Sequence, residues 1–196
     1  AVAILAAGGN IAYLPYAAFL GALLTAALIY LLSWKRGISA TRLVLVGIGI
    51  NAVLGAIITY ITIKYPIERV IAAARWQAGT LFGATWDDAR TLSIGLFFLL
   101  PPAFFLTTRL RILQLGDETA ITIGSKIERD RLALLAVASL LAALAVSVVG
   151  PLGFVALIVP QAARLLVGSL TGGVLIFTAL LGGFFLLGAD LIAQRL

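Results

Sequence analysis

Long apolar runs constrain this chain more than any other feature of its sequence. A helix needs about 20 mostly apolar residues to cross the hydrocarbon core of a bilayer. Such runs occupy residues 11–34, 43–63, 91–108, 132–149 and 174–193, the last interrupted only by small residues and by Asp190. Charged residues make up 11% of the 196, whereas soluble domains carry about 25%. The sequence therefore predicts an all-α, polytopic transmembrane helical bundle that crosses the bilayer at each run.

Two places depart from straight spans. A proline pair at 101–102 stands in the middle of the third run and predicts a kink, because proline removes a backbone donor from the helix. Residues 150–168, "GPLGFVALIVPQAARLLVG", are apolar but punctuated by glycines and prolines. Their uninterrupted apolar stretch, 152–159, is too short to cross a bilayer. We therefore expect a short or broken helix that packs inside the protein.

Small residues recur along two of the runs. Gly47, Gly49 and Gly55 lie on the second run, and Gly182, Gly183 and Gly188 lie on the last. Small residues at about this spacing let helices approach closely. We expect tight packing in a bundle of many helices, and the polar Asn51 at mid-span leaves a place on a transport pathway open as the alternative.

The composition argues against most enzyme chemistry. The sequence has no cysteine, so disulfides and thiolate metal ligands are excluded, and no histidine, the usual zinc ligand and general base. A phosphate-binding loop of the glycine–lysine–serine/threonine type is also missing from the sequence. The chain itself is therefore predicted to be no enzyme and to bind no metal or other cofactor.

The connecting segments differ in charge. Residues 35–42 and 109–131 carry eight basic and four acidic residues, and they fall on one side of the membrane if the chain crosses at each run. The segment 64–90, on the other side, carries four basic and three acidic residues. Because lysine and arginine near span ends favour the cytoplasmic side, we expect the first side to be cytoplasmic. The net charge of +6 then reflects orientation in a membrane, and we expect no binding to nucleic acid.

The segment 115–131, "LGDETAITIGSKIERDR", is a polar interruption between two spans. Asp117 can cap a short helix, Glu118 adds favourable negative charge to its first turn, and Gly124 can end it in a left-handed conformation. A second helical stretch, 125–131, then leads into the next span. The residues predict a cytoplasmic helix–glycine–helix segment, and they leave open whether it is an ordinary structured loop or a docking site for another protein.

Some polar and aromatic side chains have ordinary explanations at the ends of spans. Arg164 can extend its charged group to the cytoplasmic interface. Trp76 and Trp86 suit the aromatic belt at a membrane surface, and Asp87 and Asp88 suit a cap on the third span. None of these residues requires a functional role on its own.

The order of the motifs resembles a known family. The stretches "GTLFGATWDD", "LGDETAITIG", "GPLGFVALIVPQAARLLVG" and "GADLIAQR" follow one another, with spans between them, as in the permease subunits of ABC importers for iron–siderophores, haem and vitamin B12. The resemblance covers nearly the whole chain, roughly the fourth to the ninth of that family's ten helices. It implies that residues 1–196 form a single transmembrane permease domain that is incomplete at both ends.

The resemblance assigns roles to three groups of residues. The first matches the family's cytoplasmic coupling helices, which sit in a cleft on the ATP-hydrolysing subunit: Gly116, Asp117, Glu118, Thr119, Ala120 and Gly124. The second matches a motif that leads into a helix beside the translocation pathway: Gly150, Pro151, Gly153, Phe154, Pro160, Gln161 and Arg164. The third is Arg195, which lies where relatives carry a basic residue that meets acidic residues of the binding protein.

The chain departs from the family's pattern at two places. Gln161 stands where relatives usually have histidine, and residues 169–174, "SLTGGV", stand where they have an aspartate–histidine–arginine cluster. A catalytic or metal-relay role for that histidine is therefore not available. The two changes weaken any inference about the substrate.

The resemblance also implies a function with several partners. The chain would be a permease subunit that moves an iron–siderophore or related metal chelate inward across the bacterial cytoplasmic (inner) membrane. Its implied partners are ABC ATPase subunits carrying ATP and magnesium, an extracytoplasmic substrate-binding protein, a second permease copy or sister permease, and membrane lipid.

Two other functions fit the residues less well. A secondary transporter driven by an ion gradient needs carboxylates near mid-span, and only Asp190 comes close to that depth. A membrane-embedded enzyme would have neither histidine nor cysteine, and few acids within the spans.

Overall fold

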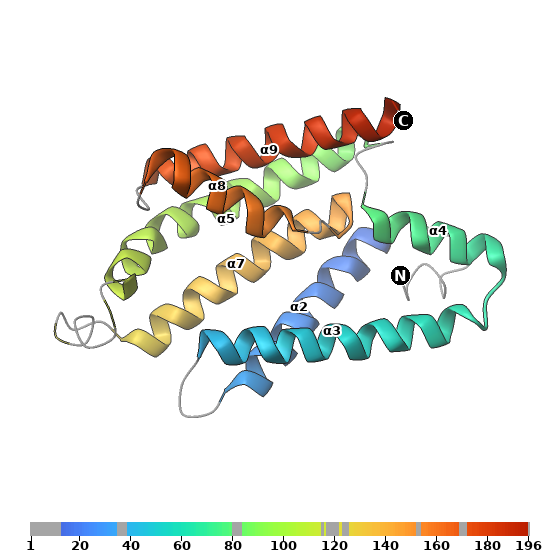
Figure 1. Cartoon of the computed structure of the whole chain (residues 1–196), viewed down its shortest axis with the longest axis horizontal. Coiled ribbons are helices and arrows are strands. Elements are labelled where there is room, and N and C mark those ends of the chain that lie inside the picture. Colours follow the sequence, from blue (N-terminus) through green and yellow to red (C-terminus); the bar gives the residue numbers. More distant parts are fainter. Residues whose placement is uncertain are drawn as a thin grey trace.

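A computed structural model describes residues 13–34, 39–79, 84–114, 116, 122, 126–151, 154–168 and 172–195. Within these residues the chain forms seven helices and no strand (Figure 1). The helices are α2 (Leu14–Ser33), α3 (Ala40–Thr62), α4 (Ile67–Ala78), α5 (Trp86–Gln114), α7 (Ile127–Val149), α8 (Val155–Val167) and α9 (Gly172–Arg195).

Each of the five apolar runs forms a long helix, as predicted. The helices α2, α3, α5, α7 and α9 are long and apolar enough to cross a membrane. Most of their large apolar side chains are exposed, and among the described residues of α3 and α9, α3 has no buried residue and α9 has only Val174. A helix that is apolar on all sides suits a lipid environment or contact with further helices. The chain is therefore a multi-pass membrane protein.

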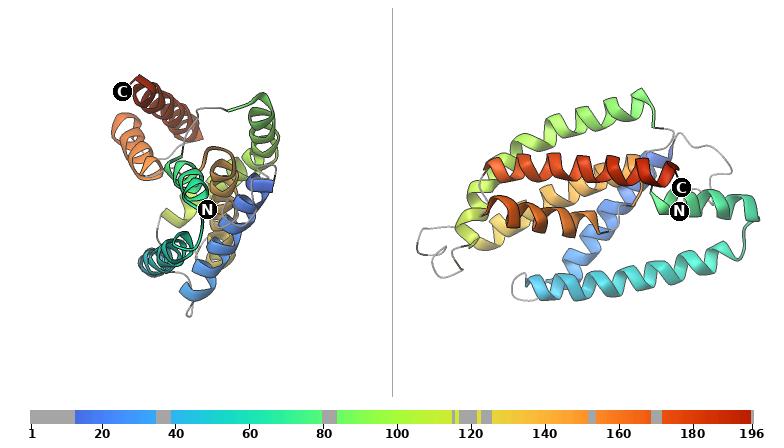
Figure 2. Two further views of the ribbon diagram at one scale, coloured as in Figure 1. Left: turned by 90° about the vertical axis from the view of Figure 1, so that its right-hand side faces the viewer. Right: turned by 45° about the horizontal axis from the view of Figure 1, so that its top comes forward.

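The third span begins with a reciprocal cap. The carboxylate of Asp88 accepts hydrogen bonds from the backbone N–H and the hydroxyl of Thr85, at 2.9 and 2.7 Å. The N–H of Asp88 donates in return to the Thr85 hydroxyl at 3.3 Å. This arrangement satisfies donors that have no partner within the helix. The predicted capping role is confirmed for Asp88. The helix continues through the proline pair at 101–102 as one element and bends along its length (Figure 2).

The helix α4 lies in the connector 64–90, where no helix was predicted. Its 12 residues are of mixed polarity and form no long apolar run, so the hydropathy pattern does not reveal it. Local signals were nevertheless present. Pro66 precedes the helix, Glu68 lies in its first turn, Arg75 lies in its last turn, and Gly79 follows with φ of 67°. These residues complement the helix dipole and end the helix in a conformation that glycine adopts easily.

The segment 150–168 contains a short helix, α8, as predicted. Phe154, with φ of 59°, precedes the helix, and α8 then runs without interruption through Pro160. The helix is, however, not packed inside the described part of the chain. Only Val159 and Ala163 are buried, because α8 contacts α9 along one face and most of its other side chains are exposed.

The central element is α7, which packs extensively against both α2 and α5 (Figure 1). Its second half carries the buried residues Ala143, Leu144 and Ser147. On α5, Gly95 lies directly against Leu144, and a Cβ added at Gly95 would lie 2.5 Å from Leu144 Cδ2. The missing side chain therefore lets the two helices approach each other. The pair α8 and α9 lies to one side of this group, and α3 packs against α2 (Figure 2).

Of the glycines singled out in the sequence, two contact a neighbouring helix. A Cβ at Gly182 would meet Val159 of α8 at 3.6 Å, and one at Gly47 would meet Ile29 of α2 at 3.9 Å. At the other four positions an added Cβ would meet nothing within 4 Å: Gly49, Gly55, Gly183 and Gly188. The distances at Gly182 and Gly47 are ordinary van der Waals contacts, so the predicted tight packing is not seen at these glycines, and the other four lie on faces that are open in the described part of the chain.

The helices run so that the bundle has two distinct ends. The carboxyl end of α5 and the amino end of α7 lie at one end, which we call the basic end after Arg109, Arg111, Lys126, Arg129 and Arg131. The helix α4 and the carboxyl end of α9 lie at the other, which we call the α4 end (Figure 1). The turn between α7 and α8 also lies toward the α4 end. The charge distribution in the sequence predicts that the basic end faces the cytoplasm.

Replacing Gly95 with valine should lower the thermal stability of the protein. The new side chain would overlap Leu144, and overpacking of this kind costs about 1–3 kcal/mol. The measurement is the midpoint of thermal unfolding in a lipid nanodisc. The control is Gly183→Val, where an added Cβ meets nothing within 4 Å, and this variant should lose much less stability. Equal losses in the two variants would contradict a close α5–α7 contact.

Candidate functional site

The predicted coupling segment is bounded by two packed helices. Arg109 on α5 and Asp130 on α7 form an ion pair with 3.8 Å between Nη1 and Oδ2. The Asp130 side chain is only 13% exposed, while that of Arg109 is 46% exposed. Thr107, also near the end of α5, is buried. The ion pair and the helix packing hold the two ends of the intervening connection at a defined spacing.

The chain leaves α5 through a left-handed residue. Gly116 has φ of 98° and is exposed, and its N–H donates to the carbonyl of Leu113 at 3.4 Å. A residue with a side chain rarely adopts this backbone conformation. Gly116 was predicted from the family motif, whereas the left-handed turn was expected at Gly124. The new observation gives Gly116 a physical reason to be glycine.

Most of the predicted coupling residues cannot be compared with the structure. Asp117, Glu118, Thr119, Ala120 and Gly124 lie outside the described residues, so the helix–glycine–helix shape stays a prediction. The second helical stretch is confirmed for residues 127–131. Helix α7 begins at Ile127 and continues from this stretch into the span, as predicted.

The second predicted group begins in the turn between α7 and α8. Gly150 is buried, has φ of 83° and donates its N–H to the carbonyl of Val146 at 3.0 Å. Pro151 is exposed, and Gly153 lies outside the described residues. Phe154 has its carbonyl at the start of α8, while its ring is 75% exposed. A phenylalanine in the left-handed region is strained, which is common where a fixed side-chain direction matters.

The remaining members of this group lie along α8. Pro160 is half-buried within the helix, and Gln161 and Arg164 are exposed. Arg164 lies in the last turn, where its charge complements the helix dipole and its carbonyl accepts the N–H of Gly168 at 2.9 Å. The group therefore does not converge on one point. Its first members lie toward the α4 end, and Arg164 lies one helix length away.

Arg195 stands apart from both groups. It is exposed and lies in the last turn of α9, at the α4 end of the bundle (Figure 1). This end is the one predicted to face away from the cytoplasm. Its location is compatible with a contact to an extracytoplasmic protein, and its charge also complements the dipole of α9.

Gly79 is a further candidate that the sequence did not single out. An added Cβ there would lie 2.6 Å from the carbonyl oxygen of Pro151. Gly79 and the α7–α8 turn thus form a backbone contact between segments far apart in the sequence. In the sequence, Gly79 directly follows an amphipathic stretch. This pattern indicates where a helix ends, but not which segment contacts that end.

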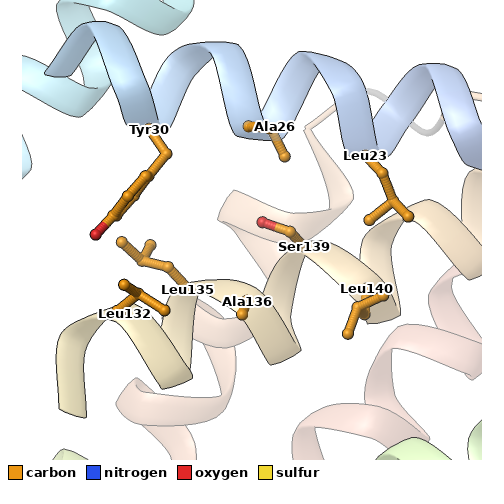
Figure 3. A pocket seen from close by; sticks show the side chains of 9 residues that line it. Leu23, Ala26, Tyr30, Leu132, Leu135, Ala136, Ser139 and Leu140 are labelled. Carbon is orange, nitrogen blue, oxygen red and sulfur yellow. The ribbon is translucent and has the colours of Figure 1, made fainter. Parts of the chain in front are cut away.

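A groove of about 340 Å³ lies between α2 and α7. Figure 3 shows the Tyr30 ring directed toward Leu132 and Leu135, and the Ser139 hydroxyl directed toward α2. The other lining residues are leucine and alanine, and the lining contains no charged side chain. None of the residues predicted for the site lines this groove, and we assign it no role.

The described part of the chain contains no group of three or more His, Cys, Asp or Glu side chains that could hold a metal ion. The candidate residues are instead glycines, prolines and exposed polar groups. Such residues suit backbone turns and surfaces rather than bond-making chemistry.

The comparisons with known proteins cover the whole chain. The profile of the FecCD transport family matches residues 1–196. The chain is 37% identical to the ferric enterobactin transport system permease protein FepG of Escherichia coli (strain K12), over all of this chain and 59% of that protein. It is 37% identical to the iron(3+)-hydroxamate import system permease protein FhuG of Bacillus subtilis (strain 168), over 93% of this chain and 54% of that protein.

A third relative and a solved structure agree with these two. The cobalamin import system permease protein BtuC of Halobacterium salinarum is 38% identical, over 91% of this chain and 48% of that protein. A solved structure described as an inward-facing metal-chelate type ABC transporter matches with a TM-score of 0.89 and 25% identity, over 99% of this chain and 62% of that one. The chain therefore spans about half to three fifths of the length of the proteins it matches.

Reversing the charge of either Arg109 or Asp130 should destabilise the protein, and exchanging the two residues should restore part of the loss. Because Arg109 is half-exposed, the expected coupling energy is about 0.2–1 kcal/mol. A double-mutant cycle on the midpoint of unfolding, using Arg109→Asp, Asp130→Arg and the double variant, measures it.

The control cycle pairs Asp130→Arg with Arg111→Asp, a charge on the same helix as Arg109 that forms no ion pair with Asp130 among the described residues. Purely additive effects in both cycles would contradict an ion pair at this position.

Proposed function

The chain belongs to the FecCD transport family, and from this premise we propose that it forms the transmembrane part of a permease subunit in an ABC importer. The observation that carries the proposal is the family match over all 196 residues, joined to relatives that are named as transport system permeases. The five apolar helices supply the membrane-spanning structure that a permease requires. The family is one of transport permeases, so we assign no catalytic role to this chain.

The energy source would be a separate pair of ATPase subunits, which bind ATP and magnesium. The connection between α5 and α7 would dock on them, through Gly116 and the neighbouring residues Asp117, Glu118, Thr119, Ala120 and Gly124. The geometry of the two helix ends that border this connection supports the docking role. The ion pair between Arg109 and Asp130 fixes the spacing of the helix ends, and Gly116 turns the chain sharply at its exit from α5.

Transport would follow from a shift between two conformations. ATP binding would close the ATPase pair, and the docked connection would pass this movement to the packed helices α5 and α7. Because these helices contact each other closely at Gly95 and Leu144, they would tilt together rather than separately. A ligand shifts such an equilibrium only through contacts that differ between the two states, and the closing ATPase would supply that difference.

The substrate would be a metal chelate. The matched relatives are named for ferric enterobactin, iron(3+)-hydroxamate and cobalamin, all of them metal chelates. Residues 150–164, with Phe154 exposed at their start, would border the pathway. A substrate-binding protein would dock at the α4 end, where Arg195 could pair with an acidic residue. The working unit would include a second permease copy or a sister permease, in the bacterial inner membrane.

The permease reconstituted with its ATPase and binding protein should take up the chelate only while ATP is hydrolysed. Vanadate should stop uptake, and collapsing the ion gradients with ionophores should leave it unchanged. The opposite pattern would identify a secondary transporter driven by an ion gradient. In that case the half-buried Asp190 would be the first carboxylate to examine.

Replacing Glu118 and Gly124 together with alanine should uncouple ATP hydrolysis from uptake. We expect uptake to fall at least about tenfold, because coupling between sites typically corresponds to factors of 5–150. The protein should remain in the membrane at its normal level. The measurement is the amount of chelate imported per ATP hydrolysed.

The control makes the same two changes outside the predicted coupling motif, with Glu128→Ala and Gly168→Ala. Both residues are exposed, and a Cβ at Gly168 would meet nothing within 4 Å. Uptake in the control should stay close to that of the unmodified protein. Equal uptake ratios in the two double variants would argue against docking through this segment.

A further inference from the structure

A close backbone contact joins α4 to the turn after α7, two segments that are far apart in the sequence. A Cβ added at Gly150 would lie 2.7 Å from the carbonyl oxygen of Trp76 and 3.2 Å from Gly79 Cα. From the other side, a Cβ at Gly79 would lie 2.6 Å from the carbonyl oxygen of Pro151. The atoms that would be struck belong to the backbone, so they cannot move aside as the tip of a side chain can. The ends of α4 and α7 are therefore in direct backbone contact at their terminal glycines.

Both glycines also follow the last residue of a helix and donate their N–H groups to carbonyls of its last turn. The N–H of Gly79 donates to the Trp76 carbonyl at 3.2 Å, and that of Gly150 donates to the Val146 carbonyl at 3.0 Å. Their φ angles are 67° and 83°, a region where residues with side chains are strained. Each position therefore requires glycine for two separate reasons, the backbone conformation and the lack of space.

The rest of α4 is attached to the bundle along one face. Ala73 is fully buried and Trp76 is half-buried, whereas most of the remaining side chains of the helix are exposed. At its other end α4 is joined to α3 through residues 63–66, which contain Pro66. A short helix with a proline at one end and a tight contact at the other has two neighbours that it could follow in a movement, α3 or the α7–α8 turn.

We propose that the contact between Gly79 and Gly150 makes α4 follow the α7–α8 turn during the transport cycle, so that both are positioning residues for transport. This inference rests on the proposed function. Helix α7 begins next to the predicted ATPase-docking connection and ends at Gly150, and therefore one helix joins the two regions. A movement that starts at the basic end would reach α4 at the other end through this contact. Gly150 is one of the pathway residues that the family resemblance implies, and its contact with α4 would give it a physical role.

The first test uses alanine at two glycines of matched backbone geometry. Gly150→Ala introduces strain and also separates α4 from the turn. Gly168→Ala introduces the same kind of strain, since Gly168 has φ of 90° and donates its N–H to a helix carbonyl, but an added Cβ there meets nothing within 4 Å. In the assembled transporter, we expect Gly150→Ala to lower uptake per ATP hydrolysed at least about fivefold. Gly168→Ala should leave this ratio nearly unchanged.

ATP hydrolysis separates positioning from simple damage. The docking connection lies at the far end of α7, so the Gly150→Ala transporter should still hydrolyse ATP while importing little chelate. Equal uptake per ATP in the Gly150→Ala and Gly168→Ala transporters would overturn the inference. If the unmodified transporter itself shows no ATP-driven uptake, the proposed function fails instead, and the two failures are therefore distinguishable.

The second test leaves the glycines in place, and so does not depend on whether the alanine variants fold. Because the chain has no cysteine of its own, single cysteines introduced at chosen positions can carry spin labels. One pair joins Gln77 on α4 to Ala156 on α8, and the other joins Gln77 to Ala52 on α3, all three exposed positions. Distances are measured in the transporter without nucleotide and after trapping with ATP and vanadate.

The expected result is that the Gln77–Ala156 distance changes by no more than about 2 Å between the two states, while the Gln77–Ala52 distance changes by more. This outcome would show α4 moving with the α7–α8 turn. A constant Gln77–Ala52 distance would overturn the inference, because α4 would then follow α3 or stay still. A change in the Gln77–Ala156 distance beyond this limit would overturn it as well.

Discussion

Close packing around α7 is the constraint on which the rest of the structure depends. Lipid tails are as apolar as leucine, so helices in a bilayer gain little from hiding apolar surface and need close contact instead. In this chain Gly95 lets α5 reach Leu144, and Gly79 lets α4 reach the end of α7 at Gly150. The two contacts lie along the second half of a single helix. Whatever moves α7 therefore also moves the elements on both sides of it.

The spans could be predicted from the sequence because one physical requirement dominates them. Every backbone polar group in a bilayer must be paired internally, so a long apolar run has few alternatives to a helix. The helix α4 escaped this reasoning because it is short and of mixed polarity, although Pro66 and Gly79 mark its limits. A short helix was expected within 150–168 and is present as α8, but the left-handed conformation of Phe154 before it could not be predicted from the residue type.

The members of the candidate site and their roles remain predictions from the sequence, whereas the arrangement of the described members could be seen only in the structure. The motif order identified the groups around Gly116 and Gly150, and the structure gives each of these glycines a left-handed backbone that accounts for the residue type. No sequence pattern could reveal that Arg109 pairs with Asp130, or that Gly79 lies against Gly150, since both contacts depend on how distant helices pack. Residues 117–121 and 123–125 lie outside the described structure, so the predicted docking surface still rests on the sequence.

The described residues contain no cluster of side chains that could hold a metal ion, which is compatible with the transport of a metal that is already chelated. A metal chelate presents the organic surface of its ligand, because the ion already has its donor atoms. A permease for such a substrate does not have to coordinate the ion and can border its pathway with small, apolar and a few polar side chains. The sequence has no histidine or cysteine, and Gln161 stands where the family's usual histidine would be. Selection among chelates would then depend on the shape of the pathway and on the binding protein, and not on chemistry at the metal.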